Sequence, residues 1–185
     1  MRTFQLTTLL LVLALAAGTF IGPNYAAAAT AAEINRDVKN ALERLYGQSA
    51  SAKAIGEEAK GVLVFPSIVK GGYLVGGQYG EGALLKDGRT AGYYNNVQVS
   101  YGLQAGLQKY GYALFFMTDS AMKWLDKSDG WEVGVGPSIV VVDVGAATSK
   151  TTTTLQADIY AFFFDQKGLM GGLGLQGTKI TKVEK

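Results

Sequence analysis

The feature that most constrains this chain is a change of hydrophobic period at residue 61. Before it, Ile34, Val38, Leu42 and Leu45 recur at helical spacing. After it, runs such as residues 61–69 (GVLVFPSIV) are typical of strands, and glycine supplies 25 of 185 residues, above the usual share of about 7%. We therefore predict an α+β, mainly β fold in which amino-terminal helices pack on an antiparallel β-sandwich or barrel-like sheet.

Two helices are expected before the sheet. Residues 30–48 begin with Thr30 and Glu33 at the spacing of a capping box. The apolar stripe of this helix could pack on the sheet or lie in a membrane interface. A weaker helix is predicted at residues 51–60, because Gly56 lowers its propensity.

Proline and glycine positions predict a bulge and a turn in the strand region. Pro66 predicts an edge or bulge in the first strand, and Asp87-Gly88 predicts a hairpin turn after residues 72–86. A short helix is expected at residues 119–127. Further strand segments are predicted at residues 92–108, 111–117, 131–144, 155–164 and 169–181.

Several glycines alternate within these segments, as in Gly134 with Gly136 and Gly172 with Gly174. A row of glycines on one face of a sheet lets a backbone or an aromatic ring approach closely. We therefore expect Gly134 and Gly172 to be sites of tight packing.

The amino terminus has the pattern of an export signal. Arg2 precedes an apolar stretch at residues 6–17, which is too short to span a membrane, and alanines occupy positions 26–29. We predict a cleaved signal peptide over residues 1–28 and one domain over residues 29–185, with an uncleaved anchor as the alternative. The last residue removed is Ala28 or Ala29, and the expected location is the periplasm, the cell envelope or the cell exterior.

The chain offers little for catalysis. It has no histidine and no cysteine, which excludes disulfides, thiolate nucleophiles, Cys/His metal sites and Ser-His-Asp arrangements. Residues 172–177 (GLGLQG) match a dinucleotide fingerprint, but they lie in a strand-like segment where glycines have a packing role. We expect no enzyme activity, no cofactor and no metal site. The net charge of +2 gives no overall support for nucleic-acid binding.

Five cations lie around the helix-to-sheet junction and the first hairpin, beside strongly apolar segments. Cations that flank an apolar surface suit acidic lipid headgroups, whereas ordinary solvated side chains are the plainer interpretation. The candidate lipid-binding residues are Lys53, Lys60, Lys70, Lys86 and Arg89.

Four blocks in order resemble the SYLF domain family: residues 59–85, 100–108 (SYGLQAGLQ), 131–138 (WEVGVGPS) and 158–177. The resemblance extends over about residues 41–180. It implies a module that binds phosphoinositides and other acidic lipids at a membrane surface. Some eukaryotic members bind actin, a partner that an exported protein is not expected to meet.

The sequence therefore supports two hypotheses that assign this protein to different functional classes. The first is an exported protein that binds acidic phospholipid or phosphoinositide-type headgroups at a membrane surface. The alternative is a structural outer-membrane β-barrel protein, because alternating strands rich in glycine and aromatic residues also suit that fold. The doubly apolar runs at residues 139–142 and 162–164 favour strands covered on both faces and hence the first hypothesis.

Overall fold

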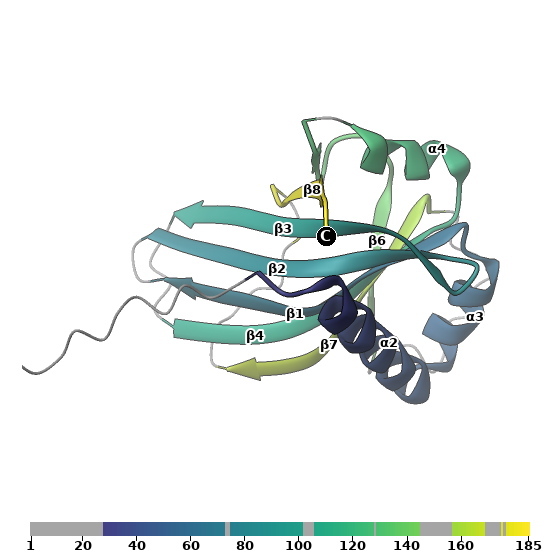
Figure 1. The fold of residues 1–185 in the computed structure, drawn as a ribbon, viewed down its shortest axis with the longest axis horizontal. Helices are drawn as coiled ribbons and strands as arrows, with labels where there is room; N and C mark the ends of the chain where they lie inside the picture. Colours follow the sequence, from purple (N-terminus) through teal and green to yellow (C-terminus); the bar gives the residue numbers. More distant parts are fainter. Residues whose placement is uncertain are drawn as a thin grey trace, which may run out of the picture.

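The computed structural model describes residues 28–72, 75–101, 106–127, 129–144, 157–168, 175 and 177–185. Its described strands form one curled sheet, and two amino-terminal helices cover part of one face (Figure 1). The mainly β, α+β class is therefore confirmed, and the single curled sheet is the barrel-like arrangement, not the sandwich. Predictions that concern the leader, Gly172 and Gly174 lie outside the described residues.

The two helices begin and end close to their predicted bounds. Helix α2 (Ala31–Gln48) is capped by Thr30, which forms the expected capping box with Glu33. Helix α3 (Ala50–Glu58) follows, with Ser49 as its cap. None of the described helices is long and apolar enough to cross a membrane.

The sheet has the strand order β5-β8-β3-β2-β1-β4-β7-β6. The pairs are antiparallel except for β6 with β7, which is parallel and corrects the expectation of a wholly antiparallel sheet. The strands are β1 (Gly61–Gly72), β2 (Val75–Lys86), β3 (Arg89–Tyr101), β4 (Gly106–Phe116), β5 (Trp131–Glu132), β6 (Ile139–Asp143), β7 (Ile159–Gly168) and β8 (Lys179–Val183).

Local sequence chemistry explains two sharp features of the first three strands. Pro66 lies where the pairing of β1 shifts register against both neighbours, so the predicted bulge is confirmed. Asp87 and Gly88 both have positive φ, at 49° and 72°, as a two-residue hairpin turn requires. The bulge in β1 and the turn between β2 and β3 therefore follow from short-range signals.

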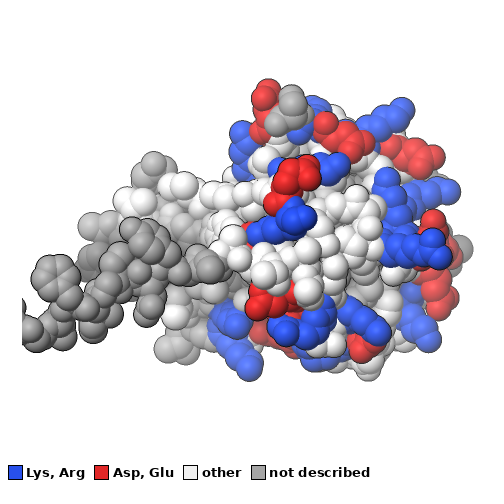
Figure 2. All heavy atoms as spheres, in the orientation of Figure 1, with Lys and Arg blue, Asp and Glu red and all other residues white. Residues whose placement is uncertain are grey.

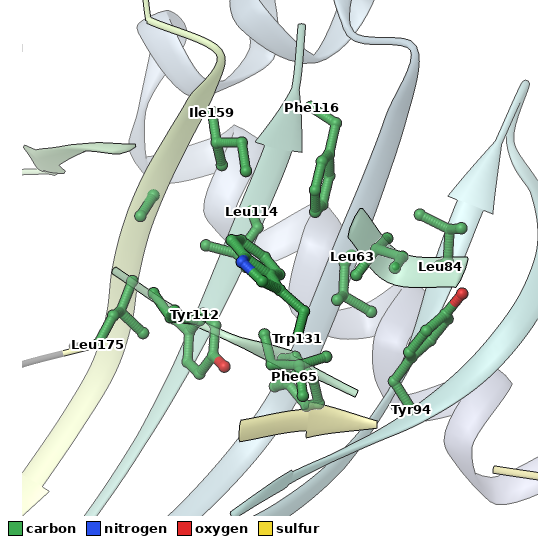
Figure 3. Packing of buried hydrophobic residues seen from close by; sticks show 14 of the residues in the cluster. Leu63, Phe65, Leu84, Tyr94, Tyr112, Leu114, Phe116, Trp131, Ile159 and Leu175 are labelled. Atoms are coloured by element: carbon green, nitrogen blue, oxygen red, sulfur yellow. The ribbon is translucent and has the colours of Figure 1, made fainter. Parts of the chain in front are cut away.

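Each face of the sheet carries its own core. On one face, Ile34, Val38, Ala41 and Leu45 of α2 are buried against strand residues, so the apolar stripe of this helix packs on the sheet. On the other face, Trp131 is 1% exposed and lies among residues of several strands, including Leu63 and Leu114 (Figure 3). The helix α4 (Asp119–Met122) and the 3-10 helix η1 (Lys123–Asp126) close this second core.

Glycines do allow close packing, at one of the predicted positions and at others: a Cβ on Gly136 would collide with the ring of Trp124, as expected of a glycine that admits an aromatic ring. Gly134 is exposed with a φ of 106°, in the turn after β5, so the expectation of a packed strand glycine is wrong there. A Cβ on Gly82 of β2 would instead collide with the carbonyl oxygen of Val64, and one on Gly111 with the ring of Phe164. Gly82 and Gly111 thus allow close approaches between neighbouring strands of the sheet.

Strand boundaries that depend on distant partners differ from the prediction. Residues 92–108 are not one strand, because β3 ends at Tyr101 and β4 begins at Gly106. These two strands are separated in the sheet by β2 and β1. Similarly, the predicted strand over 131–144 is interrupted by the turn at Val133 and Gly134. A continuous apolar pattern indicates a strand. It does not show where that strand ends and the chain begins to pair with a different strand.

Candidate functional site

An exposed apolar strip lies on the face of the sheet that α2 covers, beyond the reach of that helix. Among the described residues, eight large apolar side chains are exposed, and six of them form this strip. The strip consists of Val69, Val75, Tyr79, Val97, Val99 and Leu107, with exposed fractions of 46%, 58%, 50%, 39%, 60% and 67%.

Strand pairing explains why these six residues meet. Val69 of β1 is opposite Tyr79 of β2, and Tyr79 is opposite Val97 of β3. One row further along, Leu107 and Val99 lie on either side of Gly71 and Gly77, which face each other. Because paired residues project from the same face of a sheet, the six side chains form a continuous surface with a low centre at the glycines.

This end of the molecule differs in charge from the rest. In Figure 2 the charged atoms gather over the part that carries the helices, whereas the described atoms at the end where β1 to β4 run past α2 are largely white. A contiguous exposed apolar surface on a protein commonly marks an interaction site. The strip is therefore a candidate functional surface that the sequence did not reveal.

A groove of about 540 Å³ adjoins the strip, between α2 and strands β1, β4 and β7. Lys109 and Lys167 line it from opposite positions of β4 and β7. Arg44 of α2 also lines it, with its guanidinium 2.8 Å from the Asp165 carboxylate. Lys109 is paired with Val69 of the strip, so cations border the apolar surface directly. Three cations against the two carboxylates Asp37 and Asp165 leave the groove with a small positive excess.

A second ion pair lies at the other border of the strip. The Nζ atom of Lys185 is 2.6 Å from Oε1 of Glu81 on β2. Partial burial favours the neutral acid, but hydrogen bonds from Lys185, from the Ala29 backbone and from Tyr79 hold the pKa of Glu81 below its usual value. Partial burial and the Glu81 charge raise the pKa of Tyr79. Glu81 is therefore a carboxylate at the edge of the strip at neutral pH.

The structure brings four of the five predicted cations to one end of the sheet. Lys86 and Arg89 flank the hairpin turn, and Lys60 precedes β1, whose Val62 is paired with Leu85. Lys53 is exposed on α3, which lies at the same end (Figure 1). Exposed carboxylates from the same elements accompany these cations, so the local charge is mixed: Glu57, Glu58 and Asp87.

Lys70 is separated from this group. It lies near the other end of β1, projects from the opposite face to Val69, and is 9% exposed. The apolar run between Lys60 and Lys70 is also less accessible than its sequence suggests, because the residues from Val62 to Phe65 are buried. Within that run, Val69 is the residue that reaches the exposed strip, since the Pro66 bulge changes which side chains face outward.

Ser138 and Asp158, a hydroxyl and a carboxyl group that lie close together, are hydrogen-bonded to each other. The backbone N–H and the hydroxyl of Ser138 both donate to Oδ2 of Asp158, at 2.9 and 2.8 Å. These hydrogen bonds lower the pKa of Asp158, which makes it a poor base. The contact joins the starts of the parallel pair β6 and β7. The absence of enzyme activity stays a prediction.

A cluster of buried polar side chains inside the second core also has a structural role. Gln78 donates to Asn96 and Thr178 at 3.1 and 3.2 Å, and it accepts from the hydroxyl of Tyr110 at 2.8 Å. Asn96 also contacts the hydroxyl of Tyr112. Burial raises the pKa of Tyr110 to about 12. Because its members satisfy one another across β2, β3, β4 and the residue that precedes β8, this cluster stabilises the sheet.

Fold and surface together define a small α+β domain whose most unusual feature is an apolar strip bordered by cations, as in proteins that associate with membranes. The family model Ysc84, described as "Las17-binding protein actin regulator", matches residues 97–185. This family is that of the SYLF domain, so the match over residues 97–185 confirms the resemblance seen in the sequence. The SYLF domain is a lipid-binding module linked to actin-patch proteins. No curated protein matched the chain.

Proposed function

We propose that this protein is exported and binds acidic lipids at a membrane surface through the apolar strip and the adjoining groove. The observation that carries the proposal is the contact between Val69 and Lys109, which places the apolar strip beside the cations Lys109, Lys167 and Arg44. In this arrangement the strip enters the interface and the groove holds a phosphate-bearing headgroup.

Two physical terms support this arrangement. Apolar side chains gain about 25 cal/mol per Å² when they leave water, and each Lys or Arg near an anionic surface contributes about 1 kcal/mol. Neither term is large for so few residues, so binding should need both. The match to a lipid-binding family favours this function over the structural outer-membrane alternative.

Export is proposed from the amino-terminal pattern of Arg2, residues 6–17 and the alanines at 26–29. The lipids within reach of an exported protein are envelope phospholipids such as phosphatidylglycerol and cardiolipin, and these anionic headgroups are the proposed ligands. The printed description of the matching family names Las17 and actin. An exported chain has no expected access to either.

Vesicle flotation tests the proposal. Protein comprising residues 29–185 is mixed with vesicles of phosphatidylcholine alone, or with phosphatidylglycerol, cardiolipin or a phosphoinositide added. We expect flotation with anionic vesicles at low salt, and binding that weakens but persists as salt rises, because screening removes the charge term and leaves the apolar term. Failure to float with every anionic composition at low salt would refute lipid binding.

Four of the cations predicted from the sequence lie at the opposite end of the sheet. They form an alternative surface for contact with the membrane. A variant with Lys53, Lys60, Lys86 and Arg89 replaced by Gln removes the cations gathered there. We expect this variant to float nearly as well as the parent protein, because Glu57, Glu58 and Asp87 already offset that charge. If this variant alone lost flotation, the binding surface would lie at the end of the sheet near α3.

A further inference from the structure

The backbone of Ala29 is bonded to a carboxylate and to a lysine of the domain. The backbone N–H of Ala29 donates a 3.0 Å hydrogen bond to Oε2 of Glu81, which lies 52 residues later in β2. The Nζ atom of Lys185 bonds Oε1 of Glu81 and also donates to the carbonyl oxygen of Ala29, at 3.0 Å. The Glu81 and Lys185 side chains are 12% and 10% exposed. A largely enclosed ion pair thus holds both polar groups of the Ala29 backbone.

Among the described residues, Ala29 is also the first in the chain that packs on the domain. Its methyl group contacts the core beneath α2, whereas Ala28 is exposed. The next residue, Thr30, caps the helix. Ala29 further lines a groove of about 210 Å³ with Val69, Tyr79 and Glu81.

These contacts distinguish the two cleavage positions that the sequence leaves open. Removal of residues up to Ala29 would delete the bonds to Glu81 and Lys185 and the packed methyl group. Removal up to Ala28 would keep all three contacts and leave the Ala29 nitrogen as the new terminus. An ammonium is also a stronger partner for a carboxylate than an amide N–H is.

We propose that the leader is cut between Ala28 and Ala29, and that the new α-ammonium of Ala29 pairs with Glu81 and fastens the start of the mature chain to the sheet. The inference rests on the proposed export. In the cut, a signal peptidase adds water across the Ala28–Ala29 peptide bond. The carbonyl carbon of Ala28 becomes a carboxylate, and the released amine of Ala29 takes up a proton, as an α-amino group does near neutral pH.

The surroundings suit a positive charge at this position. A cation at the start of a helix is ordinarily unfavourable, because the helix dipole is positive there, so the site needs neighbouring negative groups. Glu33 accepts from the backbone and hydroxyl of Thr30 at 2.8 Å, and Asp37 lines the same small groove as Ala29. The titratable or charged groups around the new terminus are Glu33, Arg36 and Asp37 of α2, Tyr79 and Glu81 of β2, and Lys185.

The first test identifies the terminus. Protein recovered after export is analysed by intact mass and amino-terminal sequencing, and we expect Ala29 as its first residue. A mature chain that starts at Thr30, or at any other residue, overturns the inference while leaving export intact. A mass that still includes Met1 refutes export and this cleavage together.

The second test measures the pairing and does not depend on export. A chain that begins at Ala29 is prepared from a cleavable fusion, and its α-amine is titrated by NMR. We expect a pKa raised by about one unit above the ordinary value of about 7.7–8.0, because a carboxylate in contact favours the ammonium. In Glu81→Gln the pKa should return to the ordinary value.

The matched control is a chain that retains Glu81, so its result does not depend on whether the Glu81→Gln variant folds. A chain that begins at Ala28 is one residue longer, which carries the ammonium about 3.8 Å along the chain. We expect its α-amine to titrate normally. Equal α-amine pKa values in the chains that begin at Ala28 and Ala29 would show that Glu81 does not bind the terminus.

Discussion

Replacing Val99 and Leu107 of the apolar strip by Ser should weaken membrane binding strongly while leaving the fold intact. The two side chains are 60% and 67% exposed, so each still has more than half of its surface to bury. Full burial of such a side chain contributes about 1.5–3 kcal/mol, and the exposed portion therefore contributes about 1–2 kcal/mol. Together the pair supplies about 2–4 kcal/mol, which corresponds to a loss of affinity of about 30-fold to several hundredfold.

The chain offers a control of equal chemistry at another place. Val135, in the turn after β5, and Val141 of β6 are 54% and 57% exposed, and neither lies in the strip. The double variant Val135→Ser with Val141→Ser removes comparable exposed apolar surface. Because substitutions at exposed positions usually change the free energy of unfolding by less than about 0.5 kcal/mol, both double variants should melt close to the parent protein.

The assay is co-sedimentation with vesicles that contain phosphatidylglycerol, titrated to obtain a partition coefficient for each protein. The strip variant should partition far more weakly, and the control variant should match the parent. Equal partitioning of the strip variant and the parent would refute the strip as the contact surface. An equal loss in both variants would show that general surface hydrophobicity, and not this face, governs binding.

Three further predictions concern the groove and the fold. Replacing Lys109 and Lys167 by Gln should reduce binding to anionic vesicles at low salt by about 1 kcal/mol for each cation lost, with no change on phosphatidylcholine alone; an unchanged salt dependence in the titration would contradict a headgroup role. Gly82→Ala should destabilise by about 1–3 kcal/mol in urea unfolding, because the new Cβ meets the carbonyl oxygen of Val64. An unchanged urea midpoint would mean that β1 and β2 can separate at that point. Thr30→Ala should cost about 1 kcal/mol through loss of the helix cap, and an unaltered melting temperature would show that the capping box contributes nothing.

Features of this protein that depend on near neighbours in the chain were predictable. Helix α2 follows from its apolar period and from the Thr30–Glu33 capping box, which forms between residues three apart. The first hairpin follows from Asp87-Gly88, since few residues adopt positive φ at both positions. The bulge at Pro66 follows because proline cannot donate a hydrogen bond to a neighbouring strand.

Tertiary structure decided which residues share a surface. Lys60 and Lys70 lie ten residues apart in sequence, yet β1 carries them to opposite ends, and the bulge and burial place Lys70 away from the exposed face. Conversely, Val69, Val97 and Leu107 are distant in sequence and meet because β1 lies between β2 and β4, with β3 next to β2. Strand order is a long-range choice that an alternating pattern does not encode.

The exposed strip itself results from a mismatch between elements. Its residues have the same period-two pattern as the buried strand segments, so the sequence by itself determined that they would lie in strands and prefer to leave water. Whether they are covered depends on how far α2 extends over the sheet. The helix contacts the sheet through Ile34, Val38, Ala41 and Leu45, and β1 to β4 continue past it (Figure 1). The helix length is a local property, but which strand residues it leaves in water is decided only when helix and sheet pack together.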